Sequence, residues 1–293
     1  MIRIEFLQDA DVTAFVDWLA ERCTDMPVHL RIGGSRFVPG GIDNNVTGLN
    51  AVLELYQWRG GWADTLQTLE ALAADLRDAV ARESDEDALA ACGAIMDWGG
   101  NRNAKVGAYP FLNAMVRDDG SLCRYLRKAG AAFCLLTADL EQICPPVLLM
   151  NSMLTKVHAL YATDGLPIYD SRVAAAIATL VECWRVAEGR NDLPLPPALA
   201  FPATSRARMV TNLIHDAQKP GVMIYGAADT ASKWSSAKIR LGWILEAVLI
   251  RVPPLFANYN DLPRRMHAFE ASLFMMGSDV TCLSPLLLDG KRP

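Results

Sequence analysis

The sequence predicts a mainly helical, compact protein with one β-like excursion near its N-terminus. Apolar residues recur along most of the chain at the spacing of amphipathic helices. A Gly-rich stretch with alternating apolar residues, 28–42 (VHLRIGGSRFVPGGI), interrupts this pattern. The chain has 293 residues, 52% hydrophobic and 21% charged, which allows a large core and argues against disorder. We therefore expect residues 1–293 to fold as a single compact unit.

The individual elements follow from apolar spacing and from start and stop signals. The first residues should be extended, and a helix should begin near Asp9 or Asp11. Residues 28–42 should form a β-hairpin or a loop with extended arms. Ser84 precedes acidic residues and should cap the helix that runs to Trp98. Further helices, some of them short, are expected at 49–59, 64–82, 109–116, 120–128, 139–144, 147–153, 171–184, 206–215, 236–252 and 261–276.

Several classes of protein are disfavoured. No apolar run reaches the roughly 18 residues of a membrane span, and the first residues (MIRIE) do not resemble a signal peptide. Seven cysteines without metal-like spacing suggest reduced thiols, so we expect a cytoplasmic protein with no metal, no cofactor and no membrane partner. P-loop, Rossmann, HExxH and GxSxG motifs are absent, which disfavours the enzymes that depend on them.

The charge balance argues weakly against a nucleic-acid partner. The net charge is −5, whereas non-specific DNA binding usually depends on a basic surface. However, most of the basic residues are arginines, which suit bidentate phosphate contacts and stacking on bases. Local clusters of charge therefore matter more here than the sum.

We expect the reactive residues of the chain in the stretch 153–173 (MLTKVHALYATDGLPIYDSRV). Lys156 lies at the head of a short apolar helix, a turn with Pro167 follows, and Asp170 precedes an alanine-rich helix. A carboxylate at that position is a good N-cap, because it can accept N–H bonds of the first turn. From the residues alone, Asp170 is either only a cap or a catalytic carboxylate. Lys156 is either a solvated helix residue or a reactive amine.

This order of residues resembles the core of the helix-hairpin-helix (HhH-GPD) DNA glycosylases, especially the bacterial branch similar to 8-oxoguanine glycosylase. The resemblance covers about residues 151–184. It implies a two-lobed helical fold with a degenerate helix-hairpin-helix. Residues 104–190 would form a central lobe with the Lys/Asp motif, and residues 1–103 and 191–293 would pack together as the second lobe. It also implies double-stranded DNA as the partner, and we expect the protein to be a monomer.

The resemblance assigns roles to the residues of the motif. Asp170 would stabilise the positive charge that develops on the deoxyribose and activate the attacking group. Lys156 would be the nucleophile of the bifunctional members, which form a Schiff base and then cleave the strand. In that family Leu-x-Gly-Val-Gly precedes the lysine, and this chain has MNSMLT instead. Asn151, Ser152 and Thr155 are therefore expected to donate hydrogen bonds to a DNA phosphate.

The function implied is excision of a damaged or modified base by cleavage of its N-glycosidic bond after base flipping. Such a hydrolase would act in DNA repair or, with a specialised substrate, in antiviral defence against phage that carry modified bases. The alternative is a non-catalytic DNA-binding or defence-associated module that retains the glycosylase fold. A third hypothesis is a lysine-dependent enzyme that acts on a small molecule.

Aromatic and polar residues before the motif are candidates for contact with the base or the DNA backbone. Trp98, Arg102 and Asn103 surround a Gly-Gly turn and could read a flipped base or bind a phosphate. The alternative is a helix C-cap at Gly99 with Trp98 packed inward. Trp58 and Arg59 suit stacking on bases, although aromatic residues at helix ends usually belong to the core.

Basic residues after the motif complete the set of candidates. Arg172 lies beside Asp170 and is expected to contact DNA. Lys233 and Lys238 flank a helix start at Ser235 or Ser236, where a phosphate could bind. The alternative is an ordinary capped helix with solvated lysines.

Overall fold

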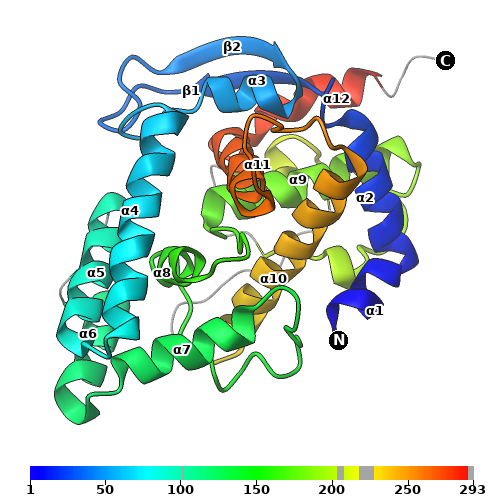
Figure 1. Cartoon of the computed structure of the whole chain (residues 1–293). Helices are drawn as coiled ribbons and strands as arrows, with labels where there is room; N and C mark the ends of the chain where they lie inside the picture. Colours follow the sequence, from blue (N-terminus) through cyan, green and yellow to red (C-terminus); the bar gives the residue numbers. More distant parts are fainter. Residues whose placement is uncertain (101, 104, 203–207, 218–227, 290–293) are drawn as a thin grey trace.

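The computed structural model describes all residues except 101, 104, 203–207, 218–227 and 290–293 (Figure 1). The described residues form α-helices α1 to α12, a few 3-10 turns and one two-stranded sheet. The prediction of a mainly helical protein with a small β excursion near the N-terminus is therefore confirmed.

The chain begins with two helices, α1 (Arg3–Gln8) and α2 (Ala10–Arg22). The carboxylate of Asp9 accepts N–H bonds from the first turn of α2, as predicted. The prediction of an extended start is wrong. The short helix α1 allows Phe6 to be completely buried in the core.

The predicted β-hairpin is confirmed. Strands β1 (Pro27–Ile32) and β2 (Ile42–Thr47) pair antiparallel, and Pro27 lies opposite Thr47. The second strand therefore begins where the predicted stretch 28–42 ends. Only the first arm was placed correctly, and residues 33–41 form the connecting loop. Helix α3 (Gly48–Glu54) follows directly. It ends before Arg59, the predicted end, whose φ of 60° is incompatible with an α-helix.

Helices α4 to α8 lie together on one side of the molecule (Figure 1). Helix α4 packs along α5, and α8 packs against α4, α5 and α7. The hydroxyl of Ser84 caps α5 as predicted. The bounds of the five helices are α4 Trp62–Ala81, α5 Asp85–Trp98, α6 Ala108–Asp119, α7 Leu122–Phe133 and α8 Leu154–Tyr161.

The short helices predicted at 139–144 and 147–153 do not form. Asp139 pairs with Ile2 in an isolated β-bridge and binds the N-terminal ammonium at 3.0 Å, so tertiary contacts fix this segment in turns. The side chain of Asn151 accepts the N–H groups of Met153 and Leu154 at 2.9 and 3.0 Å. These bonds cap the chain immediately before α8, so no helix precedes it.

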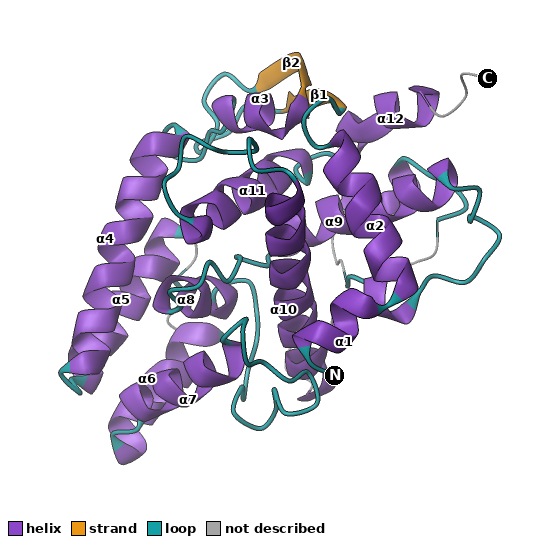
Figure 2. Ribbon diagram, turned by 45° about the vertical axis from the view of Figure 1, so that its right-hand side comes forward, coloured by secondary structure: helices purple, strands orange, loops and turns teal. Residues whose placement is uncertain are grey.

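The remaining helices gather with α1, α2 and the hairpin on the other side (Figures 1 and 2). Helix α9 packs against α11, and α10 packs against α2 and α11. The predicted helix at 261–276 is confirmed as α11, with the carboxylate of Asp261 as its N-cap. The bounds of this group are α9 Ser171–Ala187, α10 Ala228–Arg251, α11 Leu262–Met276 and α12 Ser284–Asp289.

Two predictions for the C-terminal third are corrected. Helix α10 begins at Ala228, so Ser235 and Ser236 lie inside it and do not cap it. The buried Trp234 donates to a carbonyl across the core, and such contacts keep this turn helical. The first two residues of the helix predicted at 206–215 lie outside the described residues, and the rest contains only a 3-10 turn, Val210–Asn212.

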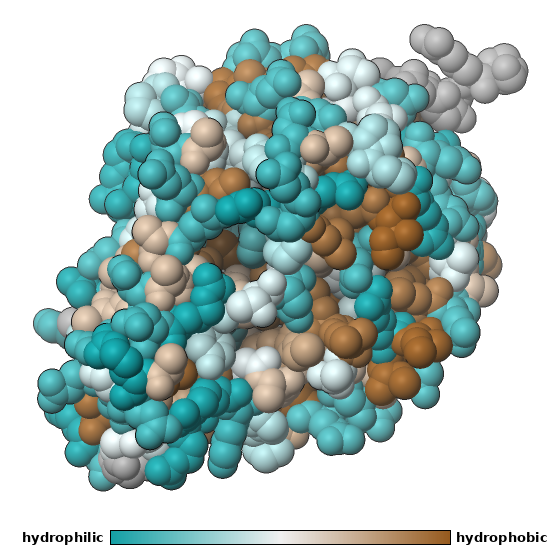
Figure 3. All heavy atoms as spheres, in the orientation of Figure 1, coloured by the Kyte–Doolittle hydropathy of each residue, from teal (hydrophilic) through white to brown (hydrophobic). Residues whose placement is uncertain are grey.

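The two groups of helices share one hydrophobic core, whose largest buried side chains include Trp184 and Trp243. All seven cysteines lie in described residues and none is in a disulfide. Among the described helices none has the length and apolar character needed to cross a membrane. Hydrophilic residues predominate over α4 and α5, and more apolar residues are exposed towards the N-terminus (Figure 3).

Candidate active site

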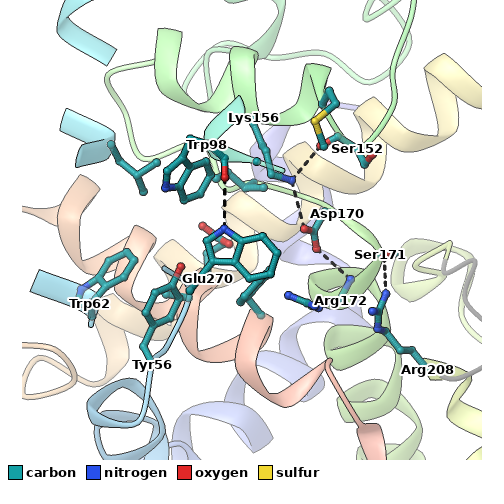
Figure 4. Close-up of a pocket in the computed structure, with 17 residues that line it drawn as sticks. Tyr56, Trp62, Trp98, Ser152, Lys156, Asp170, Ser171, Arg172, Arg208 and Glu270 are labelled. Carbon is teal, nitrogen blue, oxygen red and sulfur yellow. Dashed lines mark hydrogen bonds and ion pairs between the residues drawn. The ribbon is translucent and has the colours of Figure 1, made fainter. Parts of the chain in front are cut away.

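Lys156 and Asp170 meet at the edge of a cavity between the two groups of helices (Figure 4). Lys156 lies in the first turn of α8 and Asp170 immediately precedes α9. Lys156 Nζ is 3.3 Å from Asp170 Oδ2. Both residues are buried, with exposed fractions of 5% and 8%. The structure thus brings the two predicted reactive residues into direct contact.

Asp170 is the N-cap of α9, as predicted. Its Oδ1 accepts the N–H groups of Arg172 and Val173 at 2.9 and 3.3 Å. Burial by itself would raise the pKa of Asp170, but Lys156, Arg172 and the two N–H bonds outweigh burial and lower it from its ordinary value. The carboxylate is therefore ionised at neutral pH, and Oδ2 is left to contact Lys156.

The side chain of Lys156 is held by the chain around it. Its Nζ donates a second hydrogen bond, to the carbonyl oxygen of Ser152 at 3.0 Å. Gly99, the C-cap of α5, lies against its methylene groups. A Cβ on Gly99 would be 2.8 Å from Lys156 Cδ and 3.1 Å from Cε. The Gly-Gly pair after Trp98 indicated a turn, but not that its first glycine makes room for the lysine.

The cavity has a volume of about 180 Å³, and aromatic rings form part of its lining. The rings come from the loop between α3 and α4, from α4 itself, from the end of α5 and from α11. Lys156 and Asp170 occupy one end, and a glutamate, Glu270, reaches it from α11 (Figure 4). The aromatic residues are Tyr56, Trp58, Trp62, Trp98 and Phe274.

Trp58 is fixed on both faces and along its edge. The ring of Phe37, from the loop of the hairpin, stacks on it with 4.1 Å between centroids. The guanidinium of Arg172 lies 4.9 Å from its ring and 4.5 Å from the ring of Phe274. The Nε1 of Trp58 donates to the carbonyl oxygen of Trp98 at 3.5 Å. The aromatic wall is therefore a rigid, preformed surface next to Asp170.

Glu270 is a site residue that the sequence did not reveal. It is 5% exposed, and burial together with the nearby Asp170 carboxylate raises its pKa to about 8, against the effect of Lys156 and Lys238. It is therefore an uncharged acid at neutral pH, able both to donate and to accept a hydrogen bond. One hundred residues separate it from Asp170, and only its place in an apolar helix (HAFEASLFMM) marked it as unusual.

Three of the residues predicted to contact DNA are buried and engaged within the protein. Asn151 caps the start of α8 with its side chain. Thr155 and Lys238 are fully buried and bonded to each other. The prediction that these residues bind phosphate is corrected, because all three are buried and their side chains are bonded within the protein.

The other predicted contacts are distributed around the cavity. Trp58, Trp98, Ser152 and Arg172 line it, together with Arg208, which donates to the hydroxyl of Ser171 at 2.9 Å.

Four predicted contacts do not line the cavity. Arg59 donates to the carbonyl of Asp97 at 2.9 Å, and Arg102 is exposed and pairs with the carboxylate of the same aspartate at 3.1 Å. Asn103 and Lys233 are also exposed. These residues could contact DNA only along a surface next to the cavity.

The arrangement contains no evident metal site. Among the described residues, no group of three or more His, Cys, Asp or Glu could hold a metal ion. The charged and titratable groups at the cavity include a carboxylate, an amine, an uncharged acid and two guanidinium groups.

Comparison with protein-family models, curated proteins and solved structures gives no match to this chain. What the site does is therefore inferred from its residues and their geometry.

Proposed function

We propose that this chain is a DNA glycosylase that cleaves the N-glycosidic bond of a damaged or modified base flipped out of a duplex. The observation that carries the proposal is the buried contact of 3.3 Å between Lys156 and Asp170 at one end of an aromatic cavity. Cleavage of a glycosidic bond needs a fixed negative charge next to C1′, and an extrahelical base needs flat surfaces on which to stack.

Asp170 supplies the negative charge in this proposal. As the bond to the base breaks, positive charge develops on the deoxyribose, and an ionised carboxylate beside it lowers the barrier. The N–H groups of the first turn of α9 hold this carboxylate in place, so little reorganisation accompanies the reaction. Asp170 can also accept a proton from the attacking group.

Lys156 has two possible roles that differ in their products. As a nucleophile, its ammonium first loses a proton, and the amine attacks C1′ while the base departs, which leads to a Schiff base and strand cleavage. As a charge partner only, it orients Asp170, and a water molecule attacks C1′ instead. The second case gives an abasic site and no covalent intermediate.

The remainder of the cavity would receive the base. The ring of Trp98, which also lines the cavity, offers a stacking surface, and the uncharged carboxyl of Glu270 can bond to a polar edge. Arg172 and Arg208 lie on the same side as Asp170 and could bind the phosphates that flank the flipped nucleotide. Thus positive charge gathers at the cavity, although the net charge of the chain is −5.

In this proposal the two groups of helices are the two lobes of a glycosylase-like fold, with double-stranded DNA bound by a monomer across the cavity between them. They divide the chain differently from the predicted lobes, because α4 and α5 pack with α8 whereas α9 packs with α11. The substrate would be an oxidised base in repair or a modified base of phage DNA in antiviral defence. The volume of about 180 Å³ suits a single ring system better than a large, sugar-bearing base unless the cavity widens.

The test is a panel of duplexes, each with one oxidised or modified base, incubated with the protein with and without borohydride. Wild type is expected to release at least one base. Loss of the borohydride-trapped complex in Lys156→Ala would identify this lysine as the nucleophile. Abasic sites that survive Lys156→Ala and vanish in Asp170→Asn would identify a monofunctional enzyme.

A different result would favour the alternative function. If wild type binds duplex DNA but releases no base from any member of the panel, the glycosylase proposal is wrong. The chain would then be a DNA-binding or defence-associated module without chemistry. No binding to DNA at all would leave a small-molecule substrate of the lysine as the hypothesis to pursue.

A further inference from the structure

We infer that Lys238, a fully buried lysine on α10, is a positioning residue that fixes the distance between Lys156 and Asp170. The inference rests on the proposed function for the reaction that is positioned, but its geometry and one of its readouts are independent of that function. Nothing in the sequence pointed to this role, since Lys238 was expected at the surface as a phosphate contact.

Lys238 joins the two segments that carry the reactive groups. Its Nζ donates to the carbonyl oxygen and the hydroxyl of Thr155, at 2.9 and 3.2 Å, and to the carbonyl oxygen of Pro167. Thr155 directly precedes Lys156, and Pro167 lies three residues before Asp170. One ammonium group therefore links the first turn of α8 to the extended segment that leads into α9.

Two further bonds tighten the same link. The N–H of Tyr169, next to Asp170, donates to the hydroxyl of Thr155 at 2.9 Å. One turn before Lys238 on α10, the indole of Trp234 donates to the carbonyl oxygen of Tyr169 at 2.6 Å. Because Trp234 and Lys238 are four residues apart, both groups project from one face of the helix. Helix α10 thus holds in place the backbone next to Lys156 and the backbone next to Asp170.

The choice of a lysine at this position points to positioning rather than to stability. The side chain of Lys238 is 0% exposed, and the oxygens that accept its hydrogen bonds are all uncharged. Burial lowers the pKa of Lys238 well below its ordinary value, whereas the three acceptor oxygens around Nζ favour the ammonium form. Burying this group is costly, and an apolar side chain of similar length often stabilises a core as well or better. Only a group with three donors can bond two oxygens of Thr155 and one of Pro167 at once.

The test uses a matched pair of variants at Thr155, with a third at Lys238. Thr155→Val keeps the shape of the side chain and removes the oxygen that accepts from Lys238 and Tyr169, whereas Thr155→Ser retains that oxygen. Lys238→Met removes the ammonium and keeps the length. Ser235→Ala is the control on α10, because the buried hydroxyl of Ser235 has no hydrogen-bond partner.

Two measurements are made on each folded variant. The single-turnover rate of base release is expected to fall about 100-fold in Thr155→Val and Lys238→Met, because a displacement of about 1 Å is enough for such a loss. The Kd for DNA should change little, and Thr155→Ser and Ser235→Ala should behave as wild type. The second measurement, reductive methylation of Lys156 followed by mass spectrometry, should be severalfold faster in the two impaired variants, since Lys156 is released from Asp170.

The outcomes separate the two proposals. If wild type releases no base from any duplex, the proposed function fails, and methylation of Lys156 still tests the positioning role. If Thr155→Val matches Thr155→Ser in methylation and in any base release that wild type shows, the positioning role is wrong. Should Lys238→Met not fold, the two Thr155 variants decide the question.

Discussion

Asp170 and Glu270 are both buried carboxyl groups at the same cavity, yet their surroundings move their pKa values in opposite directions. Both are penalised by burial. Asp170 also contacts an ammonium group and accepts two N–H bonds, which lower its pKa from the ordinary value. Glu270 faces the already ionised Asp170, and its pKa is raised to about 8. The cavity therefore holds one carboxylate and one uncharged acid at neutral pH.

This difference indicates that the two carboxyl groups have different roles. Two titratable groups whose environments separate their pKa values are typical of catalytic sites, because each is then fixed in one protonation state. The ionised Asp170 suits stabilisation of a cation, and the uncharged Glu270 suits hydrogen bonding to a substrate. Removing the charge of Asp170 and removing the proton of Glu270 should consequently have different effects.

The largest effect is expected for Asp170→Asn. Asparagine is also a good N-cap, so α9 should still form, but the negative charge next to Lys156 is lost. We expect the single-turnover rate of base release to fall by about 1,000-fold, the range seen when one charge-stabilising group is removed. The Kd for DNA should remain within a few-fold of wild type. A variant that retained most of its activity would remove Asp170 from the mechanism.

The second prediction concerns stability and Glu270→Gln. Below pH 4.5 the wild-type acid is protonated in both folded and unfolded chains. Between pH 4.5 and about 8 it ionises in the unfolded chain but not in the folded one, so its contribution to the free energy of unfolding is lost as the pH rises. Glutamine has no proton to lose. Relative to wild type, the free energy of unfolding of the variant should therefore increase by on the order of 2–4 kcal/mol by pH 8.

Urea unfolding at pH 5, 6.5 and 8 measures this gain. The difference in the free energy of unfolding between variant and wild type should increase with pH, because all other titrations are common to both proteins. A difference that stays constant from pH 5 to 8 would mean that Glu270 ionises at its ordinary pKa.

Local signals were sufficient to find the helix cap at Asp170, whereas Lys156 was singled out by the resemblance to a family. Asp170 precedes a run of small apolar residues, where its carboxylate satisfies N–H groups of the first turn, and this cap is present as predicted. The same kind of signal located Ser84, Asp9 and the hairpin. Each depends on contacts between residues within a few positions of one another, which a sequence displays directly.

Contacts across the fold were not visible in the sequence. Glu270 reaches the cavity from α11, and Lys238 was expected at the surface because nothing near it in the chain indicates burial. The predicted helix at 139–144 failed for a similar reason, since the partners of Asp139 are at the N-terminus. The predicted DNA contacts of Asn151, Thr155 and Lys238 were wrong for the same reason, and the lobe boundaries and the other DNA contacts stay predictions.

Gly99→Ala offers a smaller, purely steric test. The added Cβ would meet the methylene groups of Lys156 at 2.8 Å, so the lysine side chain must shift while every ionisable group is kept. We expect base release to slow about 10- to 100-fold. Gly61→Ala is the control, because a Cβ there meets no atom within 4 Å. Equal rates for the two variants would show that the position of Lys156 is unimportant.

The smallest expected effect is the dependence of activity on pH above neutrality. It involves both carboxyl groups. As the pH passes about 8, Glu270 loses its proton, can no longer donate a hydrogen bond, and adds a second negative charge beside Asp170. We expect the wild-type single-turnover rate to fall by no more than about tenfold between pH 7 and 9.5, whereas Glu270→Gln should remain flat. Lys156, Lys238 and Tyr56 also face this carboxyl, and burial raises the pKa of Tyr56 far above this range. A fall that persisted in Glu270→Gln would therefore show that a group other than Glu270 causes it.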